Sequence, residues 1–258
     1  MSQELSNGVS ENSSKLSLFS TKLVSLPIWV VLSFFVAQLF SMLLVSGVDY
    51  IGIDLGGMNK SVLMLILSAI AYLFMIVFII SIPRLAIKNH TSLKEIGITR
   101  LPSWTDILLS PAALVVYLLI SVTFSTVFSM VFPSVDLNQA QETGFNNLTQ
   151  NYEYYLAFIA LVVLAPVAEE VIFRGYLYGK LKKYVPIWAA IIMTSVVFGA
   201  VHGAWNLAID TFALSIIMCT LRELTGNIWA SILLHMTKNG IAYYFLFINT
   251  TLLTTLGG

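Results

Sequence analysis

Residues 161–181 read LVVLAPVAEEVIFRGYLYGKL, and this stretch decides the fold class. Nearly every residue from Ala157 to Ala168 is apolar, and Glu169, Glu170 and Arg174 then follow. A charged side chain at the centre of a bilayer costs about 2.5–3.5 kcal/mol on insertion scales, so such residues usually face a cavity or one another. The stretch therefore predicts a membrane helix that carries a polar site.

The composition of the whole chain agrees with this interpretation. Of the 258 residues, 58% are hydrophobic and only 10% are charged. The 13 basic and 13 acidic residues balance, so the chain has no basic surface that would attract nucleic acid. The single cysteine, Cys219, excludes both a disulfide framework and a cysteine-rich zinc site.

Several apolar runs follow one another along the chain. They cover roughly residues 23–47, 61–82, 107–132, 154–173, 186–203, 208–221 and 228–249. A helix needs about 20 apolar residues to cross the hydrocarbon core of a bilayer. The runs predict an all-α fold, a polytopic transmembrane bundle of about seven to eight helices with its functional site in an intramembrane cavity.

The chain divides into three expected segments. Residues 1–22 are a polar tail without a signal-peptide pattern, and we expect this tail to be disordered. Residues 23–153 hold the N-terminal transmembrane helices and loops, and residues 154–250 hold the core with the charged groups. Together, residues 23–250 are expected to form one compact membrane domain. Lys and Arg gather in the tail and in alternate loops, which predicts a cytoplasmic N-terminus.

Two later runs also contain polar side chains. His202 ends the run VVFGAVH, and His235 and Asn239 lie in ILLHMTKN. If residues 184–186 form the turn of a hairpin, Glu169 and His202 lie roughly 21 and 25 Å from it along antiparallel helices. Since these depths nearly agree, the groups are expected to share one site.

Helical spacing suggests how these residues are related. Glu170 and Arg174 are four apart with the acid first, the favourable order for an ion pair. Glu169 points about 100° away, which leaves it free to face a cavity as a general base. Pro166 removes a backbone donor, so a kink or a widened turn is expected beside the carboxylates.

Less specific interpretations apply to other polar residues. Lys238 is expected to extend its amine toward the membrane surface, and Asp210 to cap a helix or line a polar gap. His90 lies in the basic loop KNHTSLKE and is expected to be solvated. The sequence contains neither an H-E-x-x-H zinc motif nor a G-x-S-x-G nucleophile turn.

Three motifs together resemble a known family. The sequences EEVIFR at 169–174, FGAVH at 198–202 and HMTKN at 235–239 are similar to the E-E-x-x-x-R, F-x-x-x-H and H-x-x-x-N/D motifs of the CPBP family. This family includes the type II CAAX prenyl endopeptidases and the bacteriocin-processing or bacteriocin-immunity proteins also called the Abi family. The resemblance covers about residues 155–250, so residues 154–250 would be a CAAX protease-like catalytic core.

The resemblance implies an intramembrane endopeptidase of the glutamate type, or a metalloprotease on older interpretations. Glu169 and His202 would activate a water molecule, while His235 and Asn239 would stabilise the oxyanion. Glu170 and Arg174 would support the first carboxylate. The glutamate-type mechanism requires no cofactor. If a metal such as zinc is present, its ligands would be Glu169, His202 and His235.

The resemblance also implies a setting for this activity. The expected partners are a peptide or membrane-protein substrate and the lipid bilayer. The short N-terminal tail, the compact size and the basic loops, rather than the resemblance, indicate a multi-pass protein of a bacterial plasma membrane. Bacteriocin self-immunity and peptide processing are the roles that the resemblance suggests. One alternative is a non-catalytic immunity or scaffold protein. Another is a proton- or cation-coupled transporter, because intramembrane carboxylates often serve transport.

Overall fold

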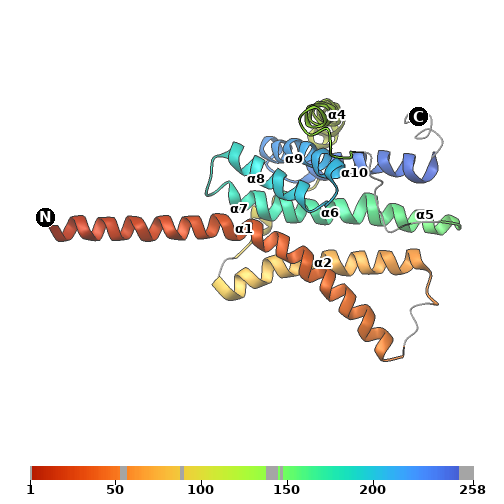
Figure 1. Cartoon of the computed structure of the whole chain (residues 1–258), viewed down its shortest axis with the longest axis horizontal. Coiled ribbons are helices and arrows are strands. Elements are labelled where there is room, and N and C mark those ends of the chain that lie inside the picture. Colours follow the sequence, from red (N-terminus) through yellow and green to blue (C-terminus); the bar gives the residue numbers. More distant parts are fainter. Residues whose placement is uncertain (1, 53–56, 88–89, 138–144, 146–147, 250–258) are drawn as a thin grey trace.

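The computed structural model describes residues 2–52, 57–87, 90–137, 145 and 148–249. All regular elements within these ranges are helices, and none of these residues lies in a strand (Figure 1). The predicted all-α class is therefore confirmed.

The elements follow one another in the order α1 to η3. The N-terminal part contains α1 (Ser2–Tyr50), α2 (Lys60–Ile87), α3 (Leu93–Ile96) and α4 (Trp104–Val131). One continuous helical stretch then comprises α5 (Asn151–Phe158), η1 (Ile159–Leu164), α6 (Ala165–Glu170), η2 (Val171–Tyr178) and α7 (Gly179–Leu181). The chain continues with α8 (Ile187–Ala200), α9 (Trp205–Thr225), α10 (Trp229–Tyr243) and η3 (Tyr244–Ile248).

Four helical segments among the described residues are long and apolar enough to cross a membrane. They are Leu23–Val48, Lys60–Leu85, Trp104–Val131 and Asn151–Leu181. The three later runs also form helices, but α8 has only 14 residues, while α9 and α10 carry more polar side chains. At 1.5 Å per residue, α8 is about 21 Å long, shorter than the hydrocarbon core of a bilayer. The chain is thus a multi-pass membrane protein. Its helices α8, α9 and α10 are shorter or more polar than the four candidate spans.

The expectation of a disordered tail is not met, because α1 begins at Ser2. Figure 1 shows this first part of α1 extending away from the bundle. Figure 1 also shows α1 changing direction along its length. Pro27 lies inside the helix, and its missing N–H and its ring account for a bend.

The stretch from α5 to α7 is the centre of the fold. In Figure 1 it runs between α1 and α2 on one side and α8 to α10 on the other. Its buried residues Ile172, Phe173 and Leu177 belong to the main hydrophobic core. Because this helix is surrounded on several sides, the charged residues that it carries must find partners inside the bundle.

The short helix α3 packs closely against the central stretch. Ser92 and Glu95 form a capping box, and Gly97 ends the helix with a φ of 85°. Glu95 also pairs with Lys183. Partial burial raises the pKa of Glu95, but hydrogen bonds from Lys183 and from the Ser92 backbone outweigh it, so this pKa lies below its ordinary value.

Replacing Gly179 with alanine is expected to weaken this packing. A Cβ atom on Gly179 would lie 2.8 Å from the backbone oxygen of Glu95, which cannot rotate away. Overpacking of this kind typically costs about 1–3 kcal/mol. Thermal unfolding in detergent should show a lower midpoint for Gly179→Ala. Gly47→Ala is the control, since a Cβ there meets nothing within 4 Å, and an equal loss in both variants would contradict the prediction.

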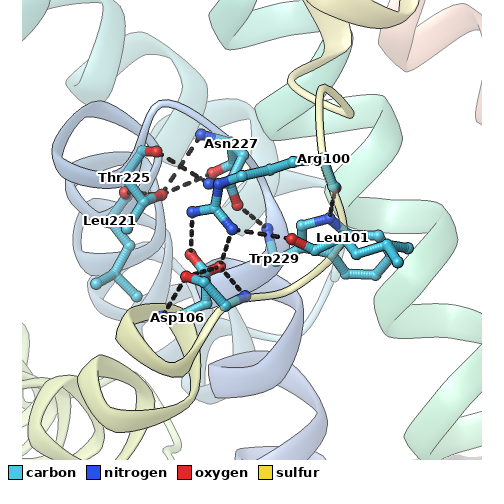
Figure 2. A network of polar contacts seen from close by, with 8 residues as sticks. Arg100, Leu101, Asp106, Leu221, Thr225, Asn227 and Trp229 are labelled. Carbon is cyan, nitrogen blue, oxygen red and sulfur yellow. Dashed lines mark hydrogen bonds and ion pairs between the residues drawn. The ribbon is translucent and has the colours of Figure 1, made fainter.

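A polar network joins the segment after α3 to the turn between α9 and α10 (Figure 2). Arg100 Nη1 donates to Asp106 Oδ2 at 2.6 Å, and Trp229 Nε1 donates to the Arg100 carbonyl at 2.6 Å. Asn227 Oδ1 accepts from the backbone N–H of Trp229 at 2.9 Å. These contacts fix the start of α4 and the start of α10 relative to each other.

Candidate active site

Glu170 and Arg174 form the predicted ion pair inside the bundle. Arg174 Nη1 lies 3.0 Å from Glu170 Oε1, and both side chains have no exposed surface. The guanidinium carbon of Arg174 also lies 4.3 Å from the centre of the Phe198 ring on α8. This fully buried pair joins α6, η2 and α8, and it fixes the orientation of the Glu170 carboxylate.

His235 on α10 joins both carboxylates. Its Nδ1 lies 2.9 Å from Glu170 Oε1, and its Nε2 lies 3.8 Å from Glu169 Oε2. The Glu170 side chain is fully buried, whereas that of Glu169 retains 13% of its exposure. Of the two neighbouring acids, Glu169 is thus the one that a small molecule can reach.

His202 lies in the turn that follows α8. Its Nδ1 is 2.7 Å from the carbonyl oxygen of Phe198, and its ring contacts the Phe198 ring edge to face at 4.9 Å. Because a carbonyl can only accept, Nδ1 carries the proton, and Nε2 is the free basic nitrogen of a neutral His202. The Phe198 ring also contacts the His235 ring edge to face at 5.9 Å, so the two histidines lie against the same aromatic side chain.

Asn239 bonds the neighbouring central helix, a structural role that is common for asparagine in membrane helices and that was open beside its role in the site. Its Nδ2 donates to the carbonyl oxygen of Leu161 at 2.9 Å. The Ala165 N–H bonds the carbonyl of Ala160, one position earlier than in an α-helix. In this wider register the donor for Leu161 would be residue 166, which is a proline. The Asn239 amide therefore satisfies a carbonyl that the widened turn and Pro166 leave free.

Asn239→Ala is expected to lower stability by about 1–3 kcal/mol, because the Leu161 carbonyl loses its donor. Thermal unfolding in detergent would measure this loss. Thr237→Ala is a suitable control on the same helix, since Thr237 is exposed and bonds only the carbonyl of Leu233 within its own helix. If Asn239→Ala lowers activity with unchanged stability, its contact with Leu161 does not stabilise the fold.

Tyr72 on α2 is a site residue that the sequence analysis missed. Its hydroxyl donates to Glu169 Oε1 at 2.7 Å. A tyrosine in an apolar run is common near membrane surfaces and gives no spacing signal by itself. The hydrogen bond brings α2 into the site, and it fixes one Glu169 oxygen while the other faces His235.

The metal ligands expected from the resemblance are Glu169, His202 and His235. In the described part of the chain, no group of three or more His, Cys, Asp or Glu side chains is placed to hold a metal ion. His235 Nδ1 and His202 Nδ1 are both engaged in hydrogen bonds. These hydrogen bonds leave Nε2 of both histidines as the atom that would bind a metal together with Glu169, so they are compatible with the expected ligand set.

A comparison with family models finds a match for the segment that carries these residues. Residues 151–241 match the model described as Rce1-like, type II CAAX prenyl endopeptidase Rce1-like. The segment is an Rce1-like domain. This Rce1-like domain contains all the site residues expected from the sequence, and the suspected resemblance is confirmed over it. Tyr72 lies outside the matched residues. The comparisons with curated proteins and with solved structures found no match.

Proposed function

We propose that this protein is an intramembrane endopeptidase that hydrolyses a peptide bond with a water molecule activated by Glu169 and His202. The arrangement around Glu169 is the observation that supports this proposal. Its carboxylate is partly exposed and lies between the Tyr72 hydroxyl and His235 Nε2 in a largely apolar bundle. A general base needs such access together with neighbours that hold its orientation.

The proposed reaction follows the chemistry of these groups. Water attacks the carbonyl carbon of the scissile bond, and Glu169 accepts the proton that the water loses. The resulting oxyanion is stabilised by His235 when its Nε2 is protonated, and by the second N–H of the Asn239 amide. The C–N bond then breaks, and the proton passes from Glu169 to the leaving amine. His202 orients the water through Nε2.

Glu170 and Arg174 are proposed to act through His235. The carboxylate of Glu170 holds Nδ1 of His235, which directs Nε2 toward the Glu169 side of the site. The Arg174 guanidinium compensates the charge of Glu170 in its buried position. No step of this mechanism passes through a metal. Measurement of bound zinc would test the alternative, since zinc lost in His202→Ala would support a metalloenzyme.

Quantitative peptidomics would test the proposed function. Cells carrying wild type or Glu169→Gln at equal membrane abundance should differ in specific peptides or mature proteins, which identify the substrates. His90→Gln is the control, because this histidine lies in a loop outside the site. Unchanged peptides together with a surviving phenotype would favour a non-catalytic immunity or scaffold role. Flux driven by pH or ions in liposomes would instead favour a transporter.

The N-terminus is proposed to lie in the cytoplasm of a bacterial cell. The pairing of Glu95 with Lys183 supports one part of this orientation, because it brings the basic segments near 94–100 and 180–183 to the same side of the bundle. Short loops rich in Lys and Arg remain on the cytoplasmic side. We propose a peptide or membrane protein as substrate, with bacteriocin self-immunity or peptide maturation as the setting.

A further inference from the structure

A second polar cluster lies beside the candidate active site, between α4, α9 and α10. Its centre is Asp210 on α9. Tyr117 and Ser121 on α4 donate hydrogen bonds to Asp210 Oδ1 at 2.5 and 2.6 Å. Lys238 Nζ on α10 lies 3.2 Å from Asp210 Oδ2. One carboxylate thus joins three helices through both of its oxygens.

This cluster differs from an ordinary surface ion pair. Tyr117 and Ser121 retain only 3% and 9% of their exposure, and the side chains of Lys238 and Asp210 retain 20% and 25%. Charges at membrane depth are costly unless they are paired. Lys238 bonds Asp210, so it does not extend freely to the membrane surface as expected. Of the two roles expected for Asp210, its contacts with α4 and α10 agree with lining a polar gap and not with capping a helix.

The position of Lys238 on α10 connects the cluster to the active site. Lys238 follows His235 by three residues and precedes Asn239 by one. His235 and Asn239 contact Glu170 and Leu161 on the central helix, whereas Lys238 contacts α9. Successive residues of a helix differ by about 100° in direction, so these contacts hold α10 from two sides and limit its rotation.

We propose that Asp210 is a positioning residue for the peptidase: through Lys238 it fixes the rotation of α10 and so holds His235 against Glu169 and Glu170. The inference rests on the proposed function for the catalytic use of His235. The rotation of α10 must be fixed closely, because the two ring nitrogens of His235 contact both carboxylates at the same time. A small rotation of α10 would break at least one of these contacts.

The test combines enzyme kinetics with the NMR signals of the His235 ring. The chain has only three histidines, so ¹⁵N-histidine labelling of the full protein in detergent resolves the His235 ring. In Asp210→Asn and Lys238→Met, we expect the His235 resonances to shift and kcat to fall about tenfold or more, with KM within twofold of wild type. Lys238→Arg keeps the cation and is expected to recover both values.

Matched variants separate positioning from folding. Tyr117→Phe removes one donor and keeps the ion pair, so it is expected to fold and to show a smaller change in the same direction. Thr237→Ala, one residue before Lys238, is expected to match wild type. Unchanged His235 resonances in folded Lys238→Met would overturn the proposal, whatever the activity. Shifted resonances in a protein that cleaves no peptide would reject the proposed function and support the positioning role.

Discussion

Arg174→Met is expected to destabilise the protein by about 3–5 kcal/mol, the usual range when one partner of a buried ion pair is removed. The Arg174 and Glu170 side chains are both fully buried. Without the guanidinium, Glu170 must either keep an uncompensated charge or take up a proton. The Phe198 ring also loses the cation that lies 4.3 Å from its centre. Equilibrium unfolding in detergent with a denaturant would measure the loss.

Two further variants make this prediction specific. Glu170→Gln combined with Arg174→Met is expected to be more stable than Arg174→Met alone, because no buried charge is then left unpaired. Lys182→Ala breaks a partly exposed pair with Glu223 and is expected to cost only about 0–1 kcal/mol. Similar losses for Arg174→Met and Lys182→Ala would show that the buried pair contributes no more than a surface pair.

The sequence was sufficient to predict the contacts that depend on helical spacing. Glu170 and Arg174 are neighbours on any helix, and apolar flanks exclude solvent as their partner. The prediction that Glu169 and His202 lie at similar depths likewise needs only a count of residues along a hairpin. These relations need only the geometry of a helix, so they could be derived without the positions of the other helices.

Contacts between distant helices could not be derived in this way. The hydrogen bond from Tyr72 to Glu169 and the pairing of Asp210 with Lys238 depend on which faces of four helices meet. An apolar helix surrounded by apolar neighbours gives no periodic signal that identifies these faces.

The widened turn near Pro166 illustrates the same limit on a smaller scale. A freed carbonyl was expected from the proline alone. Which carbonyl is freed depends on the helical register, since the π-type bond from Ala165 to Ala160 shifts the free group to Leu161. The function of Asn239 as its donor follows only from that register. The assignment of Asn239 to the oxyanion therefore has to be tested against its structural contact.

Glu169→Gln is expected to lower kcat by about 10²–10⁴-fold, the range that a general base contributes. Glutamine has nearly the same shape, and its carbonyl oxygen can still accept the hydrogen bond from Tyr72. The fold should therefore remain, while the group that accepts the proton of water is lost. Cleavage of a substrate identified by peptidomics, with purified protein in detergent, would measure the effect.

Tyr72→Phe is the control, because it leaves the Glu169 carboxylate and removes only its hydrogen-bond donor. The loss of kcat in this variant should be smaller, about tenfold. If Glu169→Gln cleaves at the wild-type rate, Glu169 is not the base, and the site must be reassigned.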